Sequence, residues 1–243
     1  QIDPLASAGL RVVAPDQRGY NLSDKPAGLA AYRLEECAND VVHLIQALGR
    51  QKAAIVGHDW GGFVAWWLGI NYPEVVEKLV ILNAPHPKVV QRILPFDPPQ
   101  WLRSLYVLFF QLTGLAEAVL RANDWELLVE GLQKTSRPGT FTGKDIEQYR
   151  RAWWKKGAMT GMLNWYRANF RMPPSLPANV RIPVPTLMLW GAKDTALGRE
   201  LAQPSIELCD QGKLIFFEEA THWLQHEEVE KVNQHLIGFL KQI

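Results

Sequence analysis

The apolar residues of this chain fall into short runs that are separated by longer segments with a helical period. Short β-branched or apolar runs bounded by turn residues are typical of buried parallel strands, and helices between them are typical of an α/β fold. The runs occupy residues 11–14, 53–57, 79–82, 186–191 and 214–217. The pattern therefore predicts a doubly wound, mostly parallel sheet.

Two of the helical segments carry a clear apolar stripe. In the first, apolar positions recur from Leu34 to Leu48 and stop at Gly49, a residue type that tolerates the left-handed conformation at a helix end. This helix would join the first two runs into one βαβ unit. The second extends from Val229 to Leu240, and we expect it to cover one face of the sheet.

The strand rhythm breaks between Lys88 and Val184, where the sequence becomes helical and rich in aromatic residues. Proline clusters bracket this stretch, at Pro95, Pro98, Pro99, Pro173, Pro174, Pro177, Pro183 and Pro185. We expect a helical cap at residues 88–184, inserted into a core formed by residues 1–87 and 185–243. Its tryptophans could wall a cavity over the strand ends, or could pack within their own domain as large aromatics mostly do. They are Trp101, Trp125, Trp153, Trp154 and Trp165.

A carboxylate stands where the second predicted strand turns into a helix. The sequence GHDWGG, at residues 57–62, follows an apolar run and precedes the apolar stretch 63–70. Glycines two residues before and two and three after Asp59 allow a sharp turn that projects its side chain from the strand end. An aspartate there could also cap the helix, but a cap needs no glycine on both sides. We therefore expect Asp59 to be a nucleophile.

Two further side chains follow strand ends in the order that hydrolases of this architecture use, nucleophile, acid and histidine. Asp194 comes just beyond run 186–191, and His222 just beyond run 214–217. Singly, each is typical of a turn or a loop. Their order and placement instead predict a triad with Asp59. The remaining histidines lie in helical patterns, begin segments or flank the elbow; these are His43, His58, His86, His226 and His235.

The composition and net charge of the chain indicate what kind of molecule it binds. The chain has 243 residues, of which 47% are hydrophobic and 21% charged, and its formal net charge is +1. This balance gives no electrostatic reason to bind nucleic acid, so we expect a small-molecule substrate and a monomer or homodimer. Cys37 and Cys209 offer neither a disulfide framework nor metal spacing, and no run is long enough to span a membrane. A cytoplasmic location without a metal or organic cofactor is expected, since Gln1 also begins no signal peptide.

Six motifs spread over core and cap carry a resemblance to a known family. They are RVVAPDQRGYNLSDKP at 11–26, GHDWGG at 57–62, NAPHP at 83–87, LNWYR at 163–167, WGAKD at 190–194 and HW at 222–223. Together they resemble the α/β-hydrolase epoxide hydrolases nearly end to end. The resemblance implies hydrolysis of epoxides to vicinal diols through an alkyl ester on Asp59, with the Trp60 backbone N–H in the oxyanion hole.

The resemblance also implies two cap tyrosines that act as acids. The pattern assigns them to Tyr106, within LYVLFFQ at 105–111, and to Tyr166, within NWYR. Tyr149, within IEQY at 146–149, is a rival for the first position. Any of them could instead be a core residue with a satisfied hydroxyl.

The chain departs from the family pattern in two places. Asn21 stands at a usual glycine position, which the turn can survive because asparagine tolerates positive φ. The family's first three strands and its His-Gly-x-Pro loop, which lends a second oxyanion-hole N–H, have no counterpart before Gln1. We therefore expect a trimmed sequence in which runs 11–14 and 53–57 share no neighbour, at a cost of about 1–3 kcal/mol per unpaired buried group.

The type of nucleophile separates the candidate reactions. A carboxylate is adequate toward a strained or activated sp3 carbon but weak toward amides, which disfavours acyl transfer. A haloalkane dehalogenase also resembles the chain at Asp59 and Trp60, but an alkoxide must be protonated whereas a halide need not be, so Tyr166 favours epoxides. Asn83 and Ala84 offer no alternative carboxylate, which supports Asp194 as the acid. A ligand receptor that keeps the fold without turnover is the second alternative.

Overall fold

The sheet contains four parallel strands in chain order, within a computed structural model that describes residues 1–93 and 96–241. They are β1 (Ala53–His58), β2 (Val76–Leu82), β3 (Thr186–Gly191) and β4 (Gly212–Phe217). The register pairs His58 with Leu82, and Gly191 with Phe217, so the carboxyl ends of the strands lie along one edge. Four of the five predicted strands are confirmed, as is their parallel arrangement.

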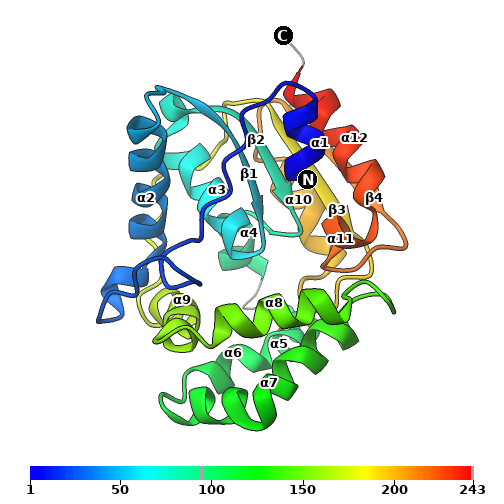
Figure 1. Ribbon diagram of the computed structural model, residues 1–243. Helices are drawn as coiled ribbons and strands as arrows, with labels where there is room; N and C mark the ends of the chain where they lie inside the picture. Colours follow the sequence, from blue (N-terminus) through cyan, green and yellow to red (C-terminus); the bar gives the residue numbers. More distant parts are fainter. Residues whose placement is uncertain (94–95, 242–243) are drawn as a thin grey trace.

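The prediction of a strand at residues 11–14 is wrong. This segment is an extended chain without ladder hydrogen bonds, drawn in dark blue in Figure 1. Within the described residues β1 pairs only with β2, so no strand lies where this segment could find a partner. An apolar run gives a strand only when its backbone groups have a neighbour. In the loop that follows, Asn21 adopts a φ of +36°, as expected at a glycine position.

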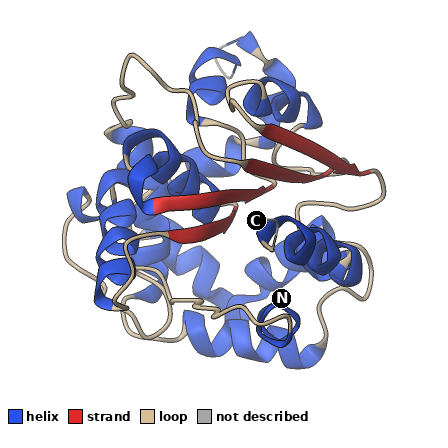
Figure 2. Ribbon diagram, turned by 90° about the horizontal axis from the view of Figure 1, so that it is seen from above, coloured by secondary structure: helices blue, strands red, loops and turns tan. Residues whose placement is uncertain are grey.

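Helices cover both faces of the sheet, as Figure 2 shows. Side chains alternate along each strand, so that Leu79 and Ile81 of β2 belong to one buried cluster and Val80 and Leu82 to the other. Burying each such side chain contributes about 1.5–3 kcal/mol, which makes these two clusters the main source of stability. The first face packs against α2 (Leu34–Ala47), α3 (Trp60–Asn71) and α10 (Ala202–Ile206), and the second against α1 (Ile2–Ser7) and α12 (Val229–Leu240).

Both predicted amphipathic helices are confirmed with close bounds. Helix α2 begins at Leu34 and ends beside Gly49, whose φ of +71° is the left-handed conformation expected there. Helix α12 has the predicted limits and buries Val232 and Leu236. The shorter elements are η1 (Ala30–Tyr32), η2 (Pro73–Val75), η4 (Arg199–Leu201) and α11 (Leu224–Glu227). In the described part of the chain, no helix combines the length and apolar character needed to cross a membrane.

Between β2 and β3, the described residues form six helices joined by loops, and they contain no strand. These helices are α4 (Pro87–Ile93), α5 (Pro98–Arg103), α6 (Leu105–Phe110), α7 (Leu115–Thr135), α8 (Gly143–Trp153) and α9 (Ala158–Arg171). Helices α5 to α9, called the helical layer below, lie beyond the carboxyl ends of the strands in Figure 1. Pro95, one of the prolines used to delimit this stretch, lies outside the described residues.

The five tryptophans of this stretch do not act together as cavity walls. Trp125 and Trp153 are buried in the layer's own cluster, whereas Trp101 and Trp154 are 47% and 57% exposed. Trp165 alone reaches down from α9 into the cluster of the sheet. The layer therefore has its own core, to which two of these five tryptophans contribute.

Candidate active site

The turn between β1 and α3 holds Asp59 in a strained conformation, with φ +51° and ψ −123°. Such a conformation costs about 1–3 kcal/mol and persists only where the surroundings enforce it. A Cβ at Gly57 would lie 2.2 Å from the Gly61 carbonyl oxygen, and a Cβ at Gly62 would lie 2.4 Å from the Ala84 Cβ. The glycines around Asp59 are therefore needed for the helix to fold back closely against the strand.

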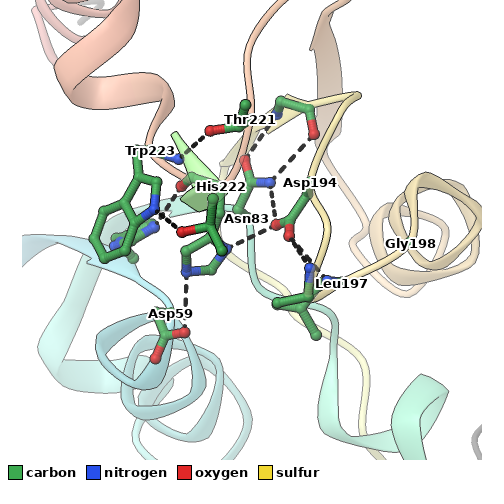
Figure 3. A network of polar contacts seen from close by, with 12 residues as sticks. Asp59, Asn83, Asp194, Leu197, Gly198, Thr221, His222 and Trp223 are labelled. Carbon is green, nitrogen blue, oxygen red and sulfur yellow. Dashed lines mark hydrogen bonds and ion pairs between the residues drawn. The ribbon is translucent and has the colours of Figure 1, made fainter. Parts of the chain in front are cut away.

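The structure brings Asp59, His222 and Asp194 together, with the His222 ring between the two carboxylates (Figure 3). His222 Nε2 lies 3.1 Å from Asp59 Oδ2, and His222 Nδ1 lies 2.7 Å from Asp194 Oδ2. The Asp194 side chain is fully buried, whereas Asp59 keeps 35% of its side chain exposed. A reactant can thus approach Asp59, while Asp194 is enclosed behind the histidine.

Asp194 is held by hydrogen bonds to both carboxylate oxygens. Ala196 N and Leu197 N donate to Oδ1 at 2.7 and 2.9 Å, and Asn83 Nδ2 donates to Oδ2 at 2.6 Å. Asn83 follows β2, and its Oδ1 accepts from Gly191 N at the end of β3. The sequence alone places Asn83 in a family motif and at a position without a carboxylate, but assigns it no role. Its position at the end of the neighbouring strand was the available signal for a supporting role.

Electrostatic interactions shift the pKa values of His222 and Asp59 in opposite directions. Burial lowers the pKa of His222, but the charge and hydrogen bond of Asp194, together with Asp59, outweigh burial and raise it to about 10. Burial raises the pKa of Asp59, but the hydrogen bond and charge of His222 outweigh it and lower this pKa below its ordinary value. The resting site therefore holds a protonated His222 beside an ionised Asp59.

His58 supports the backbone of His222. Its Nε2 is 2.8 Å from the His222 carbonyl oxygen, and its Nδ1 is 3.3 Å from Gln225 Nε2. Since an amide nitrogen only donates, Nδ1 accepts and Nε2 carries the proton. Burial, followed by the nearby His222, lowers the pKa of His58 to about 4, so it is neutral. The sequence gives no signal for this role of His58, because nothing along the chain links it to the His222 loop.

Two of the three candidate tyrosines face the same space as Asp59. Tyr106 on α6 and Tyr166 on α9 share a hydrogen bond, and their ring centroids lie 5.9 Å apart. Burial, followed among other causes by the negative charge of Asp59, raises the pKa of both hydroxyls. Tyr149 instead packs against Phe141 and Trp153 in the layer's own cluster. The site therefore combines an ionised carboxylate with two phenols that keep their protons.

Trp60 contacts both halves of the site. Its backbone N–H donates to Asp59 Oδ1, and its ring centroid lies 5.2 Å from that of Tyr166. The Trp60 side chain also hydrogen-bonds to the Tyr166 hydroxyl. Because the only polar group of a tryptophan side chain is the indole N–H, this group is the donor.

Buried Arg167 holds the two tyrosine-bearing helices together and also pairs with Glu117 of α7. Arg167, next to Tyr166 and 1% exposed, donates from Nη1 and Nη2 to Glu117 at 2.6 and 2.9 Å. Its Nε donates to the Phe110 carbonyl oxygen at the end of α6, at 2.7 Å. Burial raises the pKa of Glu117, but the Arg167 hydrogen bond outweighs it and lowers the value to about 2. The sequence analysis quoted Arg167 only as part of a motif.

Other features of the described chain lie apart from this site. One cavity, about 440 Å³, is lined by Arg18, Asp40 and Trp165 among others and by none of Asp59, Asp194 and His222. Cys37 and Cys209 are free and buried. No group of three or more His, Cys, Asp or Glu in residues 1–93 and 96–241 could hold a metal ion.

Comparison with known proteins gives consistent relatives. A family model described as "alpha/beta hydrolase fold" matches residues 1–229. The AB hydrolase superfamily protein YfhM of Bacillus subtilis is 46% identical over 99% of this chain and 84% of its own length. Epoxide hydrolase 1 of Caenorhabditis elegans is 37% identical over 95% of this chain, which spans 58% of that relative's length. A crystal structure of a Bacillus megaterium epoxide hydrolase with an inhibitor superposes with a TM-score of 0.83 at 28% identity, covering 93% of this chain and 82% of that one.

Proposed function

The chain belongs to the α/β-hydrolase fold family, within the branch that contains the epoxide hydrolases, and we propose that it hydrolyses epoxides to vicinal diols through an alkyl ester on Asp59. One observation carries the proposal. An ionised Asp59 shares its space with two protonated phenols, Tyr106 and Tyr166, whose mutual hydrogen bond keeps them side by side. This pairing of nucleophile and proton donors suits the opening of a strained C–O bond.

In the first half-reaction, a carboxylate oxygen of Asp59 attacks a ring carbon and forms a C–O ester bond. The ring C–O bond breaks, and its electron pair goes to the departing oxygen, which takes hydrogen bonds and a proton from Tyr106 and Tyr166. General-acid assistance of this kind contributes about 10²–10⁴ in rate. The raised pKa of both hydroxyls supports this role because it keeps them protonated at neutral pH.

The second half-reaction hydrolyses the ester. Esterification removes the negative charge of Asp59, and with it one of the causes that raise the pKa of His222. His222 then loses its proton more readily, restores the tyrosine proton and becomes a base. Held in one tautomer by Asp194, it takes a proton from water, which attacks the ester carbonyl carbon. The Trp60 N–H would stabilise the resulting oxyanion by about 3 kcal/mol. The tetrahedral intermediate then collapses, the bond between this carbon and the substrate oxygen breaks, and the departing oxygen takes the proton of the new Asp59 carboxylic acid, which releases the diol and restores the carboxylate.

The helical layer would act as the cap of the site, with residues 88–184 forming a unit separate from the core. Support comes from its own buried cluster and from its position beyond the strand ends. Because α6 and α9 carry the proton donors while strand ends carry the triad, a small-molecule epoxide would bind between cap and core. None of the proposed steps needs a metal or an organic cofactor.

The arrangement around Trp60 favours this reaction over dehalogenation. A dehalogenase would use the indole N–H of Trp60 to hold the departing halide, but here that group is directed to Tyr166. A receptor without turnover would not need an ionised Asp59 in line with His222 and Asp194. Both alternatives remain measurable outcomes of the same assay.

A panel of terminal, aromatic and disubstituted epoxides, with bromoalkanes as the control, tests the reaction. The expected result is diol formation from epoxides without release of bromide. Bromide release at a comparable rate would instead indicate a dehalogenase, and tight diol binding without turnover a receptor. In a single turnover in heavy-oxygen water, the label should enter Asp59 rather than the diol, since water attacks the ester carbonyl.

A further inference from the structure

The loop that carries His222 is hydrogen-bonded to a buried carboxylate that has no part in the proposed reaction. Glu227, the last residue of α11, has a fully buried side chain. It accepts from Thr221 N at 2.7 Å, from Thr221 Oγ1 at 2.6 Å and from Arg137 N at 2.8 Å. The Arg137 Nε lies 3.7 Å from its Oε2. Both oxygens of Glu227 thus face donors, as a buried carboxylate requires.

These contacts close a turn around His222. The Thr221 hydroxyl donates its only proton to Glu227. Its oxygen can therefore accept a hydrogen bond from Trp223 N, at 3.3 Å. His222 is the residue between the two partners of this bond, and Figure 3 shows Thr221 and Trp223 on either side of it. A Cβ at Gly191 would lie 2.0 Å from the Thr221 carbonyl oxygen, so the loop also lies directly against the end of β3.

The same loop is bonded to the helical layer. Arg137, which follows the end of α7, donates from Nη2 to the Glu227 carbonyl oxygen and from Nη1 to Glu228 at 2.8 Å. Trp223 Nε1 donates to Thr135 Oγ1, at the end of α7, at 2.9 Å. Glu227 therefore lies at the junction between the end of α7 and the His222 turn.

We propose that Glu227 is a positioning residue that fixes His222 for the activation of water, and that it acts on ester hydrolysis rather than on ring opening. This inference rests on the proposed function. Asp59 is set by the turn between β1 and α3, and the tyrosines are set by α6, α9 and Arg167. Glu227 contacts none of these in the hydrogen bonds and ion pairs of the described chain, and it reaches Asp59 only through His222. We therefore expect its loss to leave ring opening near the wild-type rate.

The variant Glu227→Gln tests this selectivity. Glutamine keeps the shape of the side chain but turns one acceptor oxygen into an NH₂ group, which opposes the donors of Thr221 or Arg137. A displacement of His222 by about 1 Å corresponds to a rate loss of about 10²-fold. In a single turnover followed by rapid quench and intact mass spectrometry, ring opening should stay at the wild-type rate while ester decay slows and the ester accumulates.

Glu228→Gln is the matched control, because it removes a neighbouring carboxylate that pairs with Arg137 and Lys231 but does not contact Thr221. Both half-reactions should keep their wild-type rates in this variant. Thr221→Val removes the hydroxyl that links Glu227 to Trp223 without changing any charge. It should slow ester decay and spare ring opening, and it decides the question if Glu227→Gln does not fold.

The outcomes separate this inference from the proposed function. Equal slowing of both half-reactions, or ester decay at the wild-type rate in both Glu227→Gln and Thr221→Val, overturns the positioning role. His222→Ala provides the reference for a blocked second half-reaction. If no ester accumulates even in His222→Ala, the covalent reaction itself is wrong; if it accumulates there but not in the Glu227 and Thr221 variants, only the positioning role fails.

Discussion

The two halves of the site are built in different ways. The triad half sits on strand ends, and its carboxylate Asp194 is fixed by backbone N–H groups and by Asn83 from the neighbouring strand. The tyrosine half sits on α6 and α9, which are held together by aromatic packing and by the Arg167 hydrogen bond to the Phe110 carbonyl oxygen. Strand register thus fixes one half, and a few side-chain contacts fix the other.

Because of this difference, substitutions in the two halves should have different effects on activity and on stability. Loss of Asp59, Asp194 or His222 should remove a step of the proposed reaction but leave the sheet intact, because the strands are stabilised by their buried clusters. Loss of the Arg167 contacts in the helical layer should displace Tyr106 and Tyr166 together, because Arg167 joins α9 to both α6 and Glu117 of α7. Four predictions, in decreasing order of effect, test this difference.

Asp59→Ala should have the largest effect, since it removes the nucleophile itself. We expect epoxide turnover to fall by about 10⁴-fold or more, as when other covalent nucleophiles are removed. Circular dichroism should show the wild-type fold, because Asp59 contributes strain rather than packing. Turnover within tenfold of wild type would remove Asp59 from the mechanism.

Tyr106→Phe and Tyr166→Phe should follow, each slowing ring opening by about 10²-fold or more through loss of a proton donor. Tyr149→Phe is the matched control and should keep wild-type rates, because Tyr149 packs against Phe141 and Trp153 away from the other two. Single-turnover rates of ring opening give the measurement. A strong effect at Tyr149 with none at Tyr106 would exchange their roles.

Glu117→Ala should destabilise the helical layer by about 3–5 kcal/mol, because it leaves the charge of Arg167 buried without a partner. Urea unfolding gives the change in the free energy of unfolding. Glu126→Ala, at an exposed position of the same helix, should change it by less than about 0.5 kcal/mol. Equal stability of the two variants would show that the pair does not hold the layer.

The smallest effect concerns pH. The pKa of Asp59 is lowered, so its ionised form persists to lower pH, and the pKa values of Tyr106 and Tyr166 are raised, so their protonated forms persist to higher pH. Ring opening should therefore be flat between about pH 6 and 9. Ester decay should rise with pH over the same range as His222 loses its proton. A bell-shaped profile for ring opening would contradict these assignments.

The triad half could be predicted from sequence because parallel strands end at a common edge. Asp59, Asp194 and His222 follow three predicted strands, so the sheet alone brings them to the same edge. Supporting groups could not be found in this way. Asn83 and Glu227 are recognised only when the partners of Asp194 and Thr221 are known, since these contacts join distant parts of the chain.

The tyrosine half shows the limit of local patterns more clearly. Tyr106 and Tyr149 both lie on helices with apolar neighbours, and helical periodicity does not say which one faces α9. The strand predicted at residues 11–14 was wrong for a related reason, because strand formation depends on a partner that the run itself does not specify. Long-range packing decides both cases.

The most direct test of the covalent mechanism is the intact mass of His222→Ala after reaction with an epoxide. This variant keeps Asp59, Tyr106 and Tyr166 but lacks the base that activates water. Ring opening should proceed and hydrolysis should stall, so the protein mass should rise by the mass of one substrate. A variant that stays at its unmodified mass while wild-type enzyme forms diol would contradict an ester on Asp59.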